Sequence, residues 1–130
     1  MALAPSRPDL AAYDASVRMD ISIVVKDLRD LLGVRLVAFL AGVKETRAVH
    51  EWAEGDRDIR SQEVADRLRV AYQVARLITY RDSPEVAQAW FQGLNPKLGD
   101  RSPARMLRGG DLEEVGPEIL AAARAFAAVG

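Results

Sequence analysis

The stretch VRLVAFLAGVKETRAVHEWAEG, residues 34–55, decides the fold of this chain. An apolar segment ends at Gly42, a short connection follows, and a second segment from Thr46 to Glu54 carries apolar residues at helical spacing. The side chains that would face the core are Ala48, Val49 and Trp52. Two short helices joined through a turn with a glycine describe a helix–turn–helix.

Similar signals predict helices on both sides of this motif. Upstream, residues 20–32 carry apolar residues at three- and four-residue spacing, and Gly33 ends that helix. Downstream, Ser61 is a capping residue for a long helix that ends near residue 81. The polar side chains of the long helix that we expect to face water are Arg67, Arg69, Gln73 and Arg76.

The last third of the chain is also predicted to be helical. Ser83-Pro84 and Ser102-Pro103 each pair a capping residue with a proline at the first helical position. A kink at Gly116-Pro117 precedes a final helix from Glu118 to about Val129. Because no segment shows clear period-two alternation, the predicted fold class is all-α. We expect a flexible leader over residues 1–19, a helix–turn–helix domain over 20–81 and a small helical domain over 82–130.

Composition restricts the possible function. The chain has 130 residues, 49% of them apolar and 28% charged, with a net charge of -1 and no cysteine. It is therefore not a globally basic nucleic-acid protein, and it has no disulfide or thiolate metal site. The first ten residues lack the apolar core of a secretory signal, and no apolar run is long enough for a membrane span. We expect a cytoplasmic protein.

Catalytic motifs are missing from the sequence. His50 is the only histidine, which excludes histidine triads and histidine-rich metal sites. Neither a phosphate-binding loop nor a dinucleotide fingerprint occurs. We predict that the protein is not an enzyme and holds no metal or cofactor.

The outer face of the helix–turn–helix is a candidate DNA contact surface. The residues that would contact bases or phosphates are Lys44, Thr46, Arg47, His50, Arg57 and Arg60. Three glutamates on the same helix and its turn would repel phosphate, and the turn is one residue longer than is usual for such motifs. The alternative is a helical hairpin with a solvated charged face.

A second surface is predicted around WFQGLNPKLGDRSP, residues 90–103. Two aromatic residues, two turns and a helix start follow one another there, which is typical of a segment that displays a shaped surface to another protein. Trp90 and Phe91 are adjacent and point about 100° apart on a helix. Either one of them lies in the core while the other anchors a partner, or both lie in the core on different packing faces.

The motifs of this half resemble the Xre/MbcA/ParS antitoxin family. The resemblance covers roughly residues 28–128 and is most specific in the tryptophan, Asn95-Pro96, Leu98-Gly99 and Ser102-Pro103, with a leucine four residues after Pro103. It implies an antitoxin whose carboxy-terminal domain binds a RES-domain toxin that consumes NAD or transfers its ADP-ribose. It also implies a homodimer that regulates its own operon by binding DNA. The alternative is a stand-alone helix–turn–helix transcription regulator.

The predicted toxin contacts are Trp90, Phe91, Leu94, Asn95, Lys97, Leu98, Arg101, Arg105, Arg124 and Phe126. The final helix carries one aromatic residue, so it is slim enough to cover or enter the toxin's cleft, or it packs on its own domain. The helix from Ile21 to Leu32 has a wide apolar face, which would serve either a dimer interface or an ordinary core.

Overall fold

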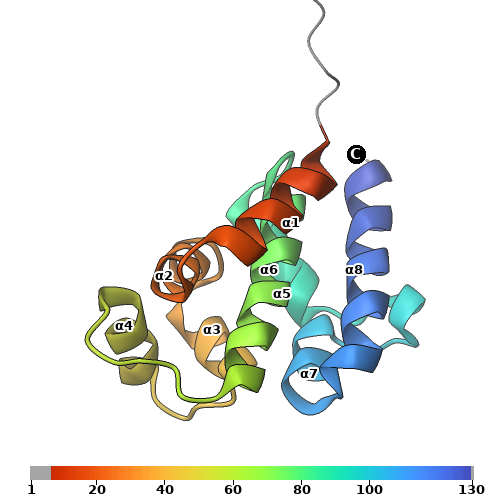
Figure 1. Cartoon of the computed structure of the whole chain (residues 1–130). Helices are drawn as coiled ribbons and strands as arrows, with labels where there is room; N and C mark the ends of the chain where they lie inside the picture. The colour runs from red at the N-terminus through yellow and green to blue at the C-terminus, as the bar shows by residue number, and fades with distance from the viewer. Residues whose placement is uncertain (1–6, 130) are drawn as a thin grey trace, which may run out of the picture.

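The computed structural model describes residues 7–129, and these form α-helices, one short 3-10 helix and connecting turns (Figure 1). Within that range there is no strand, only an isolated bridge between Asn95 and Arg101. The all-α prediction is therefore confirmed. The elements are α1 (Pro8–Arg18), α2 (Ile21–Leu32), α3 (Val34–Ala41), α4 (Thr46–Glu54), α5 (Gln62–Thr79), α6 (Pro84–Gln92), η1 (Pro96–Leu98), α7 (Pro103–Gly109) and α8 (Leu112–Val129).

Helix α5 is the centre of the fold. It packs against α1, α2, α3, α6, α7 and α8, whereas α4 is held mainly by α2 and α3 (Figure 1). Leu68, Ala71, Val74 and Ala75 are fully buried along it. Because these positions repeat every three or four residues and cover a wide arc, one helix can pack against several neighbours.

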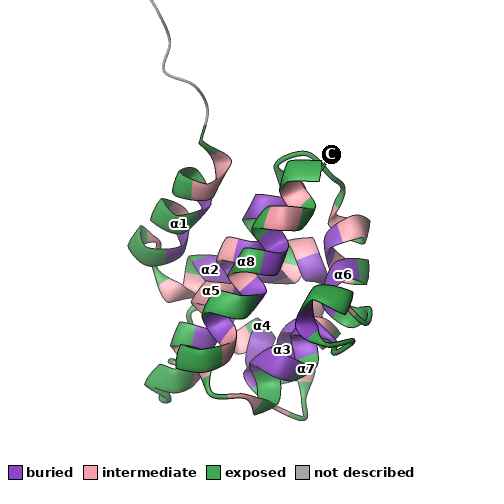
Figure 2. Ribbon diagram, turned by 90° about the vertical axis from the view of Figure 1, so that its right-hand side faces the viewer, coloured by how far each residue is buried: buried purple, intermediate pink, exposed green. Residues whose placement is uncertain are grey.

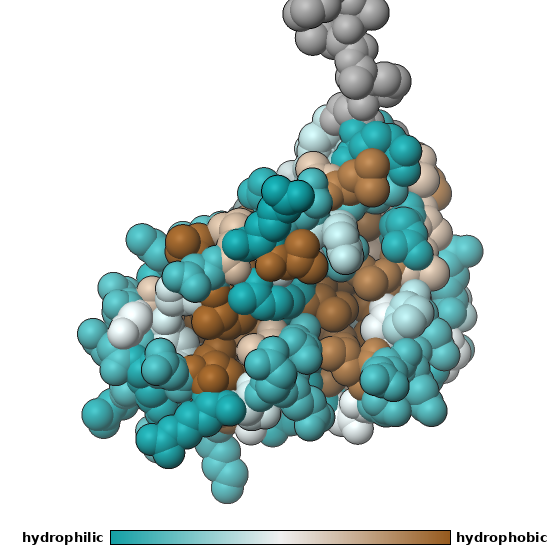
Figure 3. Space-filling model, in the orientation of Figure 1, coloured by the Kyte–Doolittle hydropathy of each residue, from teal (hydrophilic) through white to brown (hydrophobic). Residues whose placement is uncertain are grey.

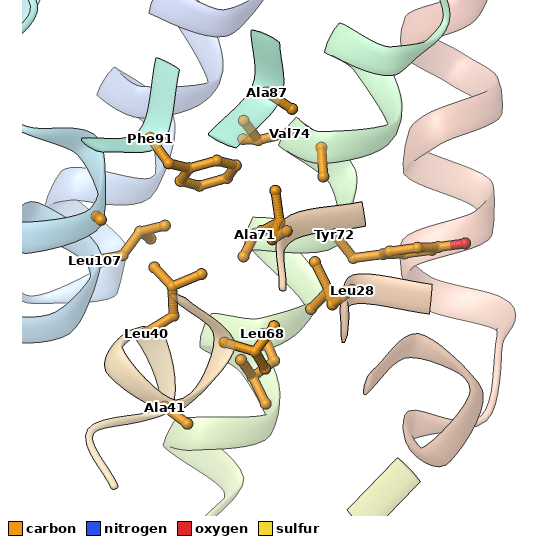
Figure 4. Packing of buried hydrophobic residues seen from close by; sticks show 14 of the residues in the cluster. Leu28, Leu40, Ala41, Leu68, Ala71, Tyr72, Val74, Ala87, Phe91 and Leu107 are labelled. Atoms are coloured by element: carbon orange, nitrogen blue, oxygen red, sulfur yellow. The ribbon is translucent and has the colours of Figure 1, made fainter. Parts of the chain in front are cut away.

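One hydrophobic core joins the two halves of the chain. Leu40 of α3 and Leu68 of α5 belong to the same buried cluster as Phe91 of α6 and Leu107 of α7 (Figure 4). Figure 2 shows the buried faces of α6, α7 and α8 turned toward the other helices. The expected boundary between residues 81 and 82 therefore does not separate two cores, and the second half is packed onto the first.

The helix ends follow the local signals in the sequence. Gly42 (φ +78°) and Gly55 (φ +79°) end α3 and α4 in the left-handed conformation, which glycine adopts without steric cost. The hydroxyls of Ser61, Ser83 and Ser102 accept hydrogen bonds from backbone N–H groups at the starts of α5, α6 and α7. The predicted starts of these three helices are thereby confirmed.

The expected flexible leader over residues 1–19 is wrong for most of its length. Residues 8–18 form α1, which packs on α5 and buries Ala12 and Ser16. The Arg69 guanidinium of α5 donates hydrogen bonds to the carbonyls of Ser16 (2.9 Å) and Met19 (2.7 Å), so it holds the end of α1 in place. Residues 1–6 of that prediction lie outside the described residues.

The start of the last helix also differs from the prediction. Helix α8 begins at Leu112, six residues before the expected start at Glu118, and Pro117 lies inside it. A proline at this position removes the hydrogen bond that its own N–H would make to the Glu113 carbonyl, and its ring crowds that carbonyl, but the helix continues through it. The predicted kink is therefore not a helix boundary.

Arg67 does not face water as expected. Its side chain is buried, and Nη1 donates a hydrogen bond to the Leu40 carbonyl at 3.0 Å. Nη2 lies 3.2 Å from Oε1 of Glu63 one turn earlier. The guanidinium thus satisfies one of the last carbonyls of α3, which have no partner within their own helix.

The apolar face of α2 is used inside the chain. Val24, Val25, Leu28 and Leu32 are buried against neighbouring helices, and Ile23 alone of the large apolar residues of α2 is exposed, at 47%. Of the two roles expected for this helix, dimer interface or core, the structure shows α2 as a core helix of its own chain. Within the described residues, no helix is both long and apolar enough to cross a membrane.

Candidate protein-docking groove

Trp90 and Phe91 are both buried in the structure. Phe91 is fully buried in the core, and Trp90 is 8% exposed beside it, with the ring centroids 5.6 Å apart and the ring planes nearly perpendicular. Edge-to-face contact is a favourable arrangement of two aromatic rings. Of the two alternatives, burial of both rings is correct, although the indole also reaches the molecular surface at a groove.

The loop after α6 is held by its own hydrogen bonds. The Asn95 side chain accepts one from the Lys97 N–H (2.9 Å), and the Asn95 carbonyl accepts from the N–H groups of Leu98 and Asp100 (both 2.9 Å). The Ser102 hydroxyl closes the loop by donating to the Phe91 carbonyl at 3.3 Å. A loop fixed in this way holds its exposed side chains in a defined position without help from a partner.

Leu94 is the exposed apolar residue of that loop, with 73% of its surface open to water. Across from it lie two residues of the last turns of α8, Phe126 (39% exposed) and Val129 (86% exposed). On the face of the molecule drawn in Figure 3, by contrast, hydrophilic side chains form most of the outer surface and the apolar residues lie between them. Apolar side chains that gather at the surface mark contact sites for other molecules.

These residues line one groove of about 650 Å³ between α6, the η1 loop and the end of α8. Small side chains, Ala122 and Ala125 among them, leave the space open, and Asp82, Asn95 and Lys97 supply polar groups at the groove. Five of the predicted toxin contacts meet here: Trp90, Leu94, Asn95, Lys97 and Phe126.

The other five predicted contacts lie elsewhere. Phe91 and Leu98 are buried, at 0% and 3% exposure, so neither presents a surface to a partner. Arg101 and Arg105 line a neighbouring hollow that shares Leu94 with the groove. Arg124 faces a separate hollow beside Tyr80 and Arg81, on the side of α8 that borders α1 and α5. The ten predicted contacts therefore do not all line the same groove.

Seven residues that line the groove are not among the predicted contacts: Asp82, Ala89, Gly93, Pro96, Ala122, Ala125 and Val129. On α8, Ala122, Ala125, Phe126 and Val129 follow the spacing of one helix face. That pattern is readable in the sequence and would have placed Val129 beside Phe126. Asp82 was missed because its place beside the groove depends on the packing of α8 against α5 and α6.

The predicted DNA contacts lie on α4 and its flanking loops. Lys44, Arg47 and His50 are exposed on the turn and α4, Thr46 is half-buried, and Arg57 and Arg60 are exposed in the loop before α5. Two carboxylates on α4 are paired with arginines: Glu51 with Arg47 at 2.8 Å, and Glu54 with Arg29 at 3.3 Å. The same Arg29 Nη1 lies 3.0 Å from Nδ1 of His50. This face therefore carries charges of both signs.

The described residues contain no group of three or more histidine, cysteine, aspartate or glutamate side chains that could hold a metal ion. Comparison with family models, with known proteins and with solved structures found no match. The surfaces of this chain and its sequence motifs are therefore the evidence for its function.

Proposed function

We propose that this protein is the antitoxin of a type II toxin–antitoxin pair and that its groove docks on a RES-domain toxin. The observation that carries the proposal is the meeting of Trp90, Leu94 and Phe126 in one groove, although they come from three separate segments. Two of these segments, α6 and the loop after it, carry motifs that resemble the Xre/MbcA/ParS family. Sequence and geometry thus favour the same surface.

The groove has the features of a protein contact site. Protein interfaces centre on a few aromatic or apolar anchors that are surrounded by polar groups. Here the Trp90 edge and Phe126 supply aromatic surface, and Leu94 supplies an exposed aliphatic side chain on a rigid loop. The amide of Asn95 and the ammonium of Lys97 supply polar groups beside them.

Inhibition would occur by steric occlusion. Ala122 and Ala123 of α8 are buried, and the Phe126 ring lies against Trp90, so the end of α8 is packed on its own chain. We propose that the toxin binds over the groove and that the ridge formed by Phe126 and Val129 covers its active-site cleft. A pre-formed surface of this kind loses little conformational entropy on binding.

A matched pair of leucine substitutions tests the docking. Leu94→Glu places a charge in the groove, whereas Leu10→Glu changes an exposed leucine of α1 (51%) that lies outside the groove. The product of the adjacent reading frame is co-expressed with each variant, and growth and complex affinity are measured. Leu94→Glu should weaken binding at least about tenfold, or roughly 1.4 kcal/mol, and Leu10→Glu should not. Equal binding by both variants, or no binding by the natural chain, contradicts the proposal.

Truncation separates occlusion from binding. Ending the chain after Ala125 removes the Phe126–Val129 ridge but keeps the buried Ala122 and Ala123. The truncated protein should still bind the toxin, more weakly, and should no longer prevent NAD consumption. Full protection by the truncated chain would overturn the occlusion mechanism and leave docking through the rest of the groove.

A second proposed activity is binding to the protein's own promoter through the helix pair α3 and α4. It is supported by the exposed cations Lys44, Arg47, Arg57 and Arg60 on α4 and its flanking loops. Binding to upstream DNA should weaken with salt, and Arg57→Glu with Arg60→Glu should reduce it by about tenfold or more. DNA binding without any toxin binding would indicate the alternative, a stand-alone transcription regulator.

A further inference from the structure

The docking groove continues beyond Leu94. A second hollow of about 650 Å³ shares Leu94 with the groove and extends past Gln92 to α7, where Arg105 stands on its rim. A third hollow of about 310 Å³ shares Gln92, Ser102 and Arg105 with the second. The three hollows therefore form one track from the end of α8 to the start of α3.

The far end of this track is lined by helices from both halves of the chain. Leu36 and Phe39 of α3 contribute its apolar surface, together with Ala104 of α7. Arg35 and Arg105 stand beside it, and both are exposed. Because α3 packs directly against α7, these two arginines are held on one surface although they are 70 positions apart (105 − 35).

The arginines in the track, Arg35, Arg101 and Arg105, and the nearby Arg108 differ in whether their guanidinium groups already have partners. Arg101 Nε donates to the Leu98 carbonyl at 2.8 Å, and its Nη2 lies 3.6 Å from Glu118. Arg108 donates to the Phe39 carbonyl at 3.1 Å and lies over the Phe39 ring. Among residues 7–129, the guanidinium groups of Arg35 and Arg105 have no ion pair and no hydrogen bond.

We propose that the partner of this chain lays a segment along the track, with apolar side chains at the Leu94 and Phe126 end and carboxylates at the Arg105 and Arg35 end. This inference rests on the proposed docking function and adds the chemistry of the partner to it. Charge complementarity selects the occupant, because two guanidinium groups without partners provide forked donors that match carboxylates. The apolar surface between them favours a protein segment over a nucleic-acid backbone.

A titration with short peptides tests the basic end without any toxin. The full chain, labelled with nitrogen-15, is titrated with a blocked peptide of alternating aspartate and glutamate, and separately with the matching asparagine–glutamine peptide. The Nε–H resonances of Arg35 and Arg105 should shift with the acidic peptide and not with the neutral one. Arg57 and Arg60 are the controls, since they are exposed arginines outside the track. Equal shifts at all four arginines, or none at Arg35 and Arg105, would overturn the inference.

Charge reversal in the toxin complex gives the second test. Arg35→Glu and Arg105→Glu should each weaken toxin binding about tenfold, with a smaller loss at high salt. Arg18→Glu, at an exposed arginine of α1 outside the track, should leave toxin binding unchanged. If the natural chain binds the toxin and neither track variant differs from it, the docking function stands and the acidic-segment inference fails. If the natural chain binds no toxin, the docking proposal fails, and the peptide titration decides the inference by itself. Loss of DNA binding instead of toxin binding would assign the two arginines to nucleic acid and overturn it.

Discussion

The indole ring of Trp90 contacts two phenyl rings, and its contact with Phe126, at 6.4 Å between centroids, ties the end of α8 to α6. The second phenyl ring is that of Phe91, which is fully buried in the core. The surface of the groove is therefore continuous with the core of the protein. A substitution at a buried ring should therefore lower stability, whereas a substitution at the exposed Phe126 ring should mainly weaken docking.

Alanine substitutions at the two groove aromatics should separate these effects. Trp90→Ala removes a large buried side chain and should lower the free energy of unfolding by about 3 kcal/mol or more. Phe126→Ala removes a ring that is 39% exposed and should cost only about 1 kcal/mol. Urea unfolding of both variants measures the difference. A cost for Phe126→Ala as large as that for Trp90→Ala would show that the end of α8 is part of the core and not a docking ridge.

Arg67 should be important for stability although it is charged. Arg67→Met removes the hydrogen bond to the Leu40 carbonyl and leaves that end of α3 without a partner, which should cost about 2 kcal/mol. Glu63→Gln removes the ion pair only, and because the Glu63 side chain is 71% exposed it should change stability by less than about 0.5 kcal/mol. Thermal unfolding of the two variants checks the ranking. If Glu63→Gln lowers the unfolding temperature more than Arg67→Met does, the main partner of Arg67 is the Glu63 carboxylate and not the Leu40 carbonyl.

The sequence predicted the helix ends at capping serines and glycines well, and it predicted the arginines that other helices cover poorly, for a physical reason. Gly42, Ser83 and Ser102 act on backbone groups within a few residues of themselves, so their role can be read locally. Arg67 and Arg69 act on carbonyls of α3 and α1, which are 27 or more positions away. Helical periodicity alone places such residues on a polar face, and only the packing of other helices shows that the face is covered.

The stability of the protein should fall at alkaline pH because of Tyr72. Burial raises the pKa of Tyr72 to about 12, and its hydrogen bond to the Asp27 carboxylate (2.8 Å) acts in the same direction. The folded state therefore keeps the hydroxyl proton that the unfolded chain, with a pKa of 10.0, has already lost. The protonated Tyr72 hydroxyl thus contributes on the order of 2 kcal/mol to the free energy of unfolding. This contribution is complete below pH 10 and is lost between pH 10 and 12.

Tyr72→Phe provides the comparison for this effect. Lysines also titrate near pH 10, so the informative quantity is the difference between the two proteins in the free energy of unfolding, measured from pH 8 to pH 12. That difference should be constant below pH 10. Above pH 10 the natural protein should lose more free energy of unfolding than the phenylalanine variant does. Parallel curves over the whole range would show that the tyrosine hydroxyl titrates alike in the folded and unfolded states.

The groove could be predicted from the sequence only in part. Trp90, Leu94 and Phe126 were identified because aromatic residues and a turn in a short segment are unusual and because the final helix has a single ring. Phe91 was proposed as a contact on the same grounds, and it is in the core. Which of two adjacent buried aromatics also reaches the surface depends on how α7 and α8 pack around α6, and the sequence of α6 does not contain that information.

The neighbouring glycines Gly109 and Gly110 should respond to alanine with opposite signs. A Cβ at Gly109, the last residue of α7, would have no neighbour within 4 Å, so Gly109→Ala should stabilise the protein by up to about 0.5 kcal/mol through helix propensity. A Cβ at Gly110 would lie 2.7 Å from the Met106 carbonyl oxygen and 2.7 Å from Cγ1 of Val115. Gly110→Ala must therefore move backbone and should cost about 1–3 kcal/mol.

The two glycine variants differ by one position and carry the same added methyl group, so each controls for the other. Urea unfolding should give midpoints on opposite sides of the natural protein's midpoint, with similar slopes. Because Gly110 and Val115 also line the second hollow of the track, Gly110→Ala should narrow it and weaken binding of a partner there. Equal midpoints for the two variants would mean that the α7–α8 connection shifts to make room for a side chain at Gly110. The close packing of Met106 and Val115 around Gly110 would then not be needed for the fold.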